Sequence, residues 1–160
     1  MGSQSDYPVV KKSEKVLKNL DIGFESRICS AHRQSDLMIK TAKFAHREGF
    51  KVIICAAGGA AHLPGMIASN TTLPVIGVPV ETKSLKGLDS LLSIVSMPKP
   101  IPVATVQINN SENAAYLAAS ILSINDEKIS LKLTKLRERV RKLIKKKPKY
   151  CPRKLGSEFY

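Results

Sequence analysis

The stretch VIICAAGGAAHLPG, residues 52–65, decides how the rest of the sequence can be arranged. Its first four residues are apolar and rich in β-branched side chains, which predicts a parallel strand buried on both faces. The strand passes directly into AAGGAA, where Gly58 and Gly59 can adopt backbone angles closed to other residues. A loop with so little side chain lets its N–H groups approach a ligand closely. We expect a ligand site here, with His62 beside it; a simple tight turn between strand and helix is the alternative.

Strand-like and helix-like segments alternate along the chain, which predicts an α/β fold with a parallel sheet wrapped by helices. His46 falls within an expected helix and is interpreted as a polar-face residue. The expected strands are 24–29, 52–55, 73–80 and 102–108, and the expected helices are 8–20, 37–48, one from 66, 85–95, 113–124 and 128–147.

The length of 160 residues and the 43% hydrophobic content predict one globular domain with a real core. No apolar run approaches the ~20 residues that a membrane span requires, and no secretory signal is visible. Cys29, Cys55 and Cys151 are far apart and lack metal-ligand spacing. We therefore expect a cytoplasmic protein without a metal site.

Positive charge is concentrated at the C-terminal end of the chain. Residues 1–127 hold 13 Lys and Arg against 11 Asp and Glu, whereas residues 128–160 hold 13 against 2. The body is thus nearly neutral, so nucleic acid is not an expected partner of it. We predict a catalytic domain over 1–144 and a solvated basic tail over 145–160; weak attraction of the tail to RNA or anionic membranes is the sharper alternative.

The N-terminal loop GSQSD, residues 2–6, leads into the first expected helix. Free N–H groups, the helix dipole and the hydroxyls of Ser3 and Ser5 would favour a bound phosphate. The carboxylate of Asp6 would repel a phosphate but suits the two hydroxyl groups of a ribose. Ordinary capping of the helix explains the same residues equally simply.

Ser30-Ala31-His32-Arg33 follows the expected strand 24–29. Ligands of open α/β sheets bind at the carboxyl ends of the strands. A histidine next to an arginine at such an end suggests a proton shuttle beside an anion anchor. The alternative is a solvated pair at a helix start.

Seven motifs, GSxSD, SAHR, AGGAAHLPG, LPVIGVPV, GLDSLLSIVxMP, PVATV and NAAYLAAxIL, occur in the order and at about the spacing seen in the PurE family. The sequence resembles the class I members over residues 1 to about 140. The resemblance implies a flavodoxin-like three-layer αβα sandwich and a homo-octamer with active sites between subunits. It also implies a reaction without metal, ATP or redox cofactor, so no cofactor is expected.

The reaction implied by the resemblance is an isomerisation in purine (IMP) biosynthesis. The carboxylate of N5-carboxyaminoimidazole ribonucleotide moves from the exocyclic nitrogen to ring carbon C4, through loss and recapture of CO2 in a closed site. The ATP-dependent synthetase of that ribonucleotide is the implied functional partner. The alternatives are direct carboxylation of aminoimidazole ribonucleotide with CO2, and a non-catalytic nucleotide- or RNA-binding protein.

The resemblance also assigns roles to individual residues. His32 matches the family's histidine that transfers the protons. Its chemistry suits that role, because an imidazole can donate and accept a proton near neutral pH. The positions that match substrate-binding residues of the family are Ser3, Ser5, Asp6, Ser30, Arg33, Gly58, Gly59, Ala60, His62 and Leu63.

One departure from the family concerns the sheet. Family members have a strand before the GSxSD loop, and this sequence begins at Met1-Gly2. That strand would lie between 24–29 and 52–55, whose separation without it would be about 9.5 Å, twice the normal spacing. We therefore expect either that translation starts upstream or that this is a truncated, unstable copy. A second departure is Asn109-Asn110 in place of a glycine; Asn tolerates left-handed backbone angles, so the turn can survive.

Overall fold

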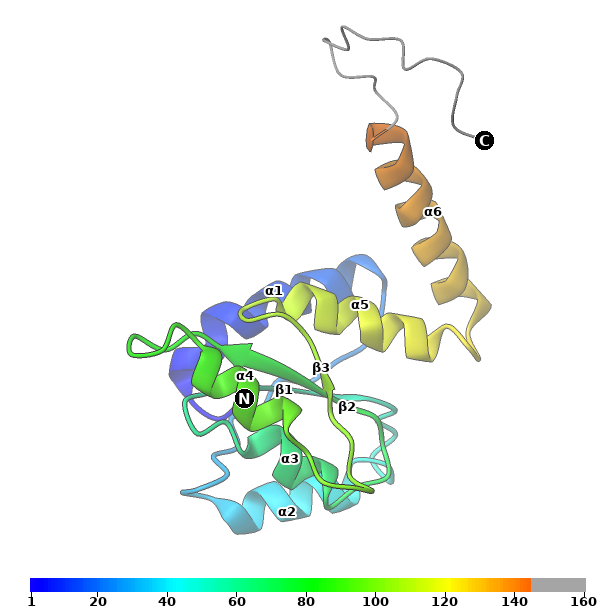
Figure 1. Ribbon diagram of the computed structural model, residues 1–160. Coiled ribbons are helices and arrows are strands. Elements are labelled where there is room, and N and C mark those ends of the chain that lie inside the picture. The colour runs from blue at the N-terminus through cyan, green and yellow to red at the C-terminus, as the bar shows by residue number, and fades with distance from the viewer. Residues whose placement is uncertain (145–160) are drawn as a thin grey trace, which may run out of the picture.

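Figure 1 shows the computed structural model, which describes residues 1–144; the predicted tail at 145–160 lies outside the described residues. Helices and strands alternate from α2 to α5, as the sequence predicts, and α6 follows α5 directly. The elements are η1 (Gln4–Asp6), α1 (Tyr7–Asn19), α2 (Ser35–Phe44), β1 (Ile53–Gly58), α3 (Leu63–Ala68), β2 (Val75–Val80), α4 (Leu88–Val95), β3 (Ala104–Thr105), α5 (Ser111–Leu122) and α6 (Glu127–Ile144).

The described residues form one sheet of three parallel strands in the order β1-β2-β3. β1 and β2 pair over six positions, from Ile53 opposite Val75 to Gly58 opposite Val80. Because the strands are parallel, their carboxyl ends meet at one edge, from which the loops to α3 and α4 leave. The predicted parallel α/β architecture is confirmed.

Successive residues of the strands pack into different helical layers, as strand geometry requires. Cys55 belongs to a core with Met38 of α2 and Ile67 of α3. Its neighbour Ala56 belongs instead to a core with Ala114 of α5. In Figure 1, α1 and α5 lie on one side of the sheet and α2 and α3 on the other. This three-layer arrangement is the predicted flavodoxin-like one.

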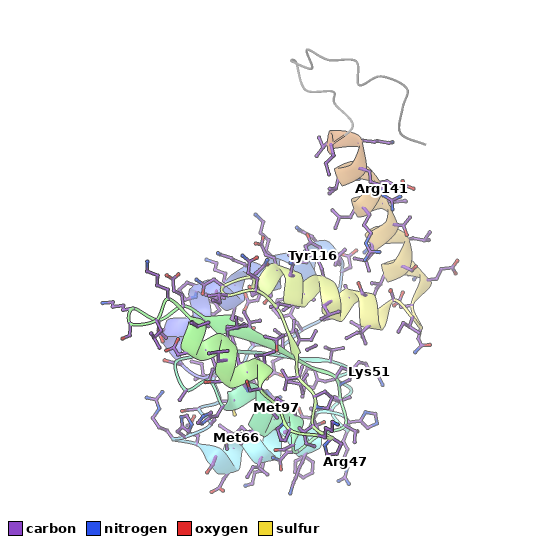
Figure 2. The ribbon with its side chains drawn as sticks, in the orientation of Figure 1. Arg47, Lys51, Met66, Met97, Tyr116 and Arg141 are labelled. Carbon is purple, nitrogen blue, oxygen red and sulfur yellow. The ribbon has the colours of Figure 1, made fainter. Side chains whose placement is uncertain are left out.

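Helix α6 is attached to the body by its first turns. Ile129 and Leu133 are buried against Leu20, and Lys132 Nζ donates to the Leu20 carbonyl at 3.0 Å. Farther along, the helix extends away from the sheet, and Arg141 lies far from the body (Figure 2). Among residues 1–144, no helix combines the length and apolar composition needed to cross a bilayer.

The strand expected at 24–29 is wrong. These residues follow an irregular path, and the chain beside them is Met1, whose amino group donates to the Arg27 carbonyl at 2.9 Å. Cys29 N–H donates to the Met1 carbonyl at 2.8 Å. On its other side, the N-terminal segment reaches β1, where Gly2 N–H donates to the Ala56 carbonyl at 3.1 Å. A strand requires a ladder, and Met1 provides a single rung of one.

Four other expected elements are shorter than predicted; two of them, β2 and α4, begin later than expected, at Val75 and Leu88. The strand at 102–108 is reduced to β3. Pro102 has no N–H to donate to a neighbouring strand, which accounts for the loss at its start. The turn after it contains Asn109 at φ 58°. This is a left-handed backbone angle, which asparagine was expected to tolerate so that the turn could form. The helix expected over 37–48 ends at Phe44, so the placement of His46 in a helix is wrong. His46 lies in the following turn, where Gly49 N–H donates to its carbonyl at 3.1 Å.

Candidate active site

A cleft of about 580 Å³ lies at the carboxyl edge of the sheet. Four segments line it: the loop after Met1, the loop before α2, the β1–α3 loop and the end of β2. All of the residues expected to form the site line this one cleft, namely Ser3, Ser5, Asp6, Ser30, His32, Arg33, Gly58, Gly59, Ala60, His62 and Leu63.

The N-terminal loop is held in shape by reciprocal bonds around η1. Ser3 N–H donates to Asp6 Oδ2 at 3.0 Å, and Ser3 Oγ accepts from Ser5 N–H at 3.3 Å. Ser5 Oγ also donates to Ser3 Oγ at 3.0 Å. This is a capping box, and it caps η1 rather than the predicted helix: Asp6 is the N-cap residue of α1 but makes no side-chain cap bond there. Capping does not exclude a ligand, because both serines still line the cleft.

Asp6 is a buried carboxyl among the residues that line the cleft. Burial raises its pKa above the ordinary value, and bonds from the Ser3 and Gly2 N–H groups together with the charged N-terminus oppose that rise. The charged form is therefore partly stabilised in place. A carboxylate so placed can accept hydrogen bonds from ligand hydroxyls.

The two cleft histidines face each other across it. His32 Nε2 lies 2.9 Å from His62 Nδ1, and the ring centroids are 5.0 Å apart at 85° to each other. A hydrogen bond between two imidazoles needs one protonated and one unprotonated nitrogen. The pair therefore holds a proton between two loops, at a position exposed to the cleft.

Arg33 provides positive charge at the same edge. Its Nε donates to Ser30 Oγ at 3.1 Å, which fixes the start of the guanidinium group. Its two terminal nitrogens make no hydrogen bond to any other residue in the described part of the chain. They remain available for the bidentate contact that arginine makes with phosphate or carboxylate.

The β1–α3 loop is pinned from behind by Ser90 of α4, which is fully buried. Gly59 N–H donates to Ser90 Oγ at 2.8 Å, and Ser90 Oγ donates to the Val80 carbonyl at 2.7 Å. Gly59 has φ 68°, which favours glycine. One hydroxyl thus links the bare loop, the end of β2 and α4.

Sequence reasoning missed several residues of the cleft. Ser90, which supports the loop from behind and does not itself line the cleft, was missed too. The one signal for it was a serine within the apolar face of a helix. Burial raises the pKa of the nearby Cys55 thiol to about 12, which keeps it uncharged and unreactive. The cleft-lining residues not expected from the sequence are Gly2, Ala31, Ala57, Val80, Glu81 and Thr82.

Comparison with known proteins identifies the family. A family model described as AIR carboxylase matches residues 1–142. The chain belongs to the AIR carboxylase family. N5-carboxyaminoimidazole ribonucleotide mutase of Thermotoga maritima is 54% identical over 147 residues, which cover 92% of this chain and 86% of that protein. The recognition of a PurE-type sequence is therefore confirmed.

Two further family relatives bear on the chemistry and on the fold. The chloroplastic phosphoribosylaminoimidazole carboxylase of Vigna aconitifolia is 50% identical over 138 residues, which cover 86% of this chain and 25% of that protein. The crystal structure of Treponema denticola PurE superimposes with a TM-score of 0.80 at 29% identity, covering 90% of each chain. The family fold is thus that of the present structure.

Proposed function

We propose that this chain is an N5-carboxyaminoimidazole ribonucleotide mutase, an isomerase of purine biosynthesis that forms 4-carboxy-5-aminoimidazole ribonucleotide. The proposal is supported by relatives of that name at about half identity over most of the chain. The observation that carries it is the imidazole pair of His32 and His62, 2.9 Å apart beside a loop of glycine and alanine.

The net reaction breaks one N–C bond, forms one C–C bond and moves one proton. The exocyclic nitrogen gains a proton as CO2 leaves, C4 attacks the CO2, and C4 then loses its own proton. A single imidazole can perform both transfers, because it donates to the nitrogen and later accepts from the carbon. We assign this role to His32, with His62 fixing its proton through the hydrogen bond between them.

The remaining cleft residues are assigned to binding. Ser3, Ser5 and Arg33 offer hydroxyl and guanidinium donors to the substrate phosphate, and Asp6 accepts from the ribose hydroxyls. Ser30 orients Arg33. The low side-chain volume of the β1–α3 loop leaves room for the imidazole ring and for CO2 beside backbone donors. We assign that wall to Gly58, Gly59, Ala60 and Leu63.

The proposal includes a homo-oligomer, with eight subunits as the expected size. An apolar row on one face of α4 and the turn before it supports association, because each of its side chains is more than half exposed. A monomer would leave this row in water. The row consists of Leu85, Leu88, Leu92 and Val95.

We further propose that the enzyme works in the cytoplasm on the product of the ATP-dependent synthetase. Cys29 and Cys55 are free thiols, as is usual in reducing compartments. The described residues include no cluster of His, Cys, Asp and Glu side chains that could hold a metal.

The test follows product formation by ultraviolet absorbance with purified protein. We expect His32→Asn to lose most turnover and to keep nucleotide binding, measured by calorimetry. Near-normal turnover of His32→Asn would refute the proton-transfer role. Activity that appears only with added bicarbonate and aminoimidazole ribonucleotide would instead identify a direct carboxylase, and no conversion of either substrate would identify a non-catalytic binding protein.

A further inference from the structure

One polar pair at the edge of the active-site cleft has no part in the function proposed above. Thr82 follows β2 and lines the cleft, and Asp89 lies in the first turn of α4. Thr82 Oγ1 lies 3.0 Å from Asp89 Oδ1 and 3.0 Å from Asp89 Oδ2. A single hydroxyl oxygen thus faces both oxygens of one carboxyl group.

The direction of the proton in this contact follows from the chemistry of the two groups. An ionised carboxylate has no proton to donate and can only accept hydrogen bonds. The position of Asp89 favours the ionised form, because the dipole of α4 attracts negative charge to its first turn. Within residues 1–144, Asp89 forms no ion pair with a cation. Thr82 is therefore the donor, and its single proton is committed to Asp89.

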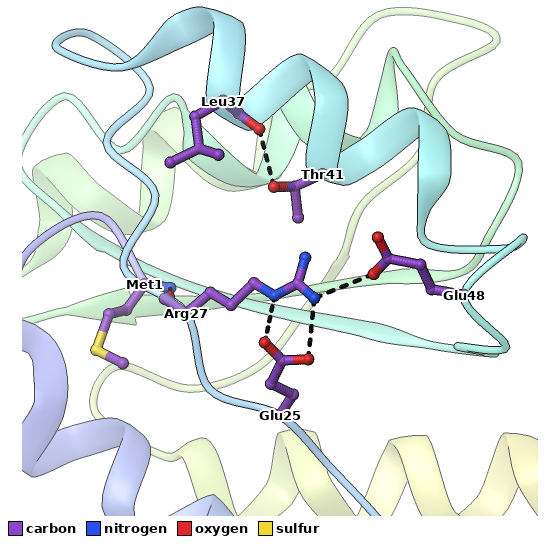
Figure 3. A network of polar contacts seen from close by, with 6 residues as sticks. All are labelled: Met1, Glu25, Arg27, Leu37, Thr41 and Glu48. Carbon is purple, nitrogen blue, oxygen red and sulfur yellow. Dashed lines mark hydrogen bonds and ion pairs between the residues drawn. The ribbon is translucent and has the colours of Figure 1, made fainter.

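The acidic side chains around Arg27 are held in a different way (Figure 3). Glu25 and Glu48 both form ion pairs with Arg27, and all three side chains are more than a third exposed. Such pairs stabilise little, because water and salt screen them. Their carboxylates meet a cation at the surface, whereas the carboxylate of Asp89 meets the hydroxyl of a residue that lines the cleft. Asp89 therefore sets the hydrogen-bonding character of the cleft at this point.

A threonine oriented in this way can bind a ligand only as an acceptor, because its lone pairs are all that it still offers. The Thr82 side chain lies beside the β1–α3 loop, since a methyl group added to Gly58 would lie 3.8 Å from Thr82 Cγ2. Under the proposed function, the heterocycle of the substrate lies against this loop. The matching group on the ligand is therefore an N–H donor of the heterocycle.

We propose that Thr82 Oγ1 accepts a hydrogen bond from the exocyclic N–H of the bound ribonucleotide. Asp89 is the positioning residue, because it holds the threonine proton away from that nitrogen. This inference rests on the proposed function. The exocyclic nitrogen carries one N–H while it bears the carboxylate and two after CO2 has left. Thr82 can therefore hold the same nitrogen throughout the reaction without gaining or losing a proton.

The same hydrogen bond would favour the step that forms the C–C bond. As C4 attacks CO2, the exocyclic nitrogen donates electron density into the ring, and its N–H groups become more acidic. A hydrogen bond from such an N–H is stronger in the transition state than in the bound substrate, which is the condition for raising kcat. The carboxylate of Asp89 polarises the Thr82 hydroxyl and makes its oxygen a better acceptor.

The first test compares two ligands by titration calorimetry: aminoimidazole ribonucleotide, and imidazole ribonucleotide, which lacks the amino group. In Thr82→Val, a side chain of nearly the same shape replaces the acceptor. We expect Thr82→Val to bind aminoimidazole ribonucleotide ~10-fold more weakly and to bind imidazole ribonucleotide as the unmodified protein does. Thr82→Ser keeps the hydroxyl and should retain the preference for the amino ligand. An equal loss for both ligands, or no loss for either, would overturn the inference.

The second test uses Asp89→Ala to examine the positioning role. Without the carboxylate, the Thr82 hydroxyl can rotate and direct its proton at the amino group. Asp89→Ala should therefore lose the preference for the amino ligand, and the double variant should bind that ligand no more weakly than Thr82→Val alone. Additive losses, or weaker binding of both ligands by Asp89→Ala, would show that Asp89 does not act through Thr82.

Thr41 of α2 provides the matched control. It is half-buried like Thr82, and its hydroxyl donates to the Leu37 carbonyl within the helix at 2.8 Å (Figure 3). Thr41→Val should leave the affinity for both ligands unchanged, because Thr41 is not among the residues that line the cleft.

The binding measurements need no turnover, so they separate this inference from the proposed function. Binding of aminoimidazole ribonucleotide by a protein that does not isomerise the carboxylated substrate would refute the proposed function and leave the Thr82 contact in place. Normal turnover with no change of ligand preference in Thr82→Val would do the reverse. Binding of neither ribonucleotide by the unmodified protein would refute both.

Discussion

Replacing Ser90 with alanine removes the one side chain among residues 1–144 that ties α4 both to the glycine loop and to the end of β2 through a single atom. The hydroxyl is fully buried. It accepts from Gly59 N–H at 2.8 Å and donates to the Val80 carbonyl at 2.7 Å. Ser90→Ala therefore leaves two part-buried backbone groups, at the edge of the cleft, without this partner.

The expected cost follows from those two groups. A buried polar group left unsatisfied costs about 1–3 kcal/mol; relaxation of the loop, and water reaching these part-buried groups from the cleft, would recover part of the sum. We expect the free energy of unfolding to fall by about 2–4 kcal/mol and Tm to fall by roughly 4–16 °C. The catalytic effect should be an increase in KM larger than the decrease in kcat, since Ser90 positions the loop without contacting substrate.

Ser93 of α4 provides a matched control. Its hydroxyl donates to the Asp89 carbonyl within the same helix at 2.7 Å, and its contact with the Gly59 carbonyl is long, at 3.4 Å. Ser93→Ala should change stability by no more than about 0.5 kcal/mol. Urea unfolding and steady-state kinetics of both variants decide the matter. Equal stability of Ser90→Ala and the unmodified protein, or equal losses in the two variants, would refute the reasoning.

Three further predictions concern charge, packing and association. Burial raises the pKa of Asp6 above its ordinary 3.8, so the folded protein binds the carboxyl proton more tightly than the unfolded chain does. The free energy of unfolding therefore falls as the pH rises from 3.8 through the raised pKa. Urea unfolding across this interval should show the decline in the unmodified protein but not in Asp6→Asn, and equal declines would contradict it. Gly77→Ala would press a methyl group into α4 and should cost about 1–3 kcal/mol, whereas Gly23→Ala, with open space around it, should cost nothing measurable by the same assay. Leu92→Asp should reduce the sedimenting mass, and Leu131→Asp, on α6 with the same 53% exposure, should not; an unchanged mass for Leu92→Asp would exclude α4 from the interface.

Local patterns in the sequence were sufficient for the main elements. The apolar run at 52–55 and the bare loop after it specify a buried strand with a cleft at its carboxyl end. The residues of the cleft come from four separated segments, and the edge of the sheet brings them together. Because every parallel strand ends at that edge, the cleft could be anticipated from the order of strands and loops.

Other features depend on contacts between distant residues and were not predictable from local patterns. The approach of His32 to His62 spans two loops, and the support that Ser90 gives Gly59 spans 31 positions. The error at 24–29 has the same origin, because a segment becomes a strand only when a neighbour supplies hydrogen bonds along its length. Similarly, the helix start at Ser35 rather than Leu37 is a matter of end effects, which sequence patterns locate poorly.

In helix α6, the residues that attach the helix to the core are separate from the arginines that carry much of its positive charge. Its anchoring residues Ile129, Leu133 and Lys132 lie in the first two turns, whereas Arg137, Arg139 and Arg141 follow beyond them. Substitutions along the outer turns can therefore change the net charge of the chain without disturbing any residue of the core. Solubility and nonspecific adhesion to polyanions could then be adjusted independently of folding and catalysis.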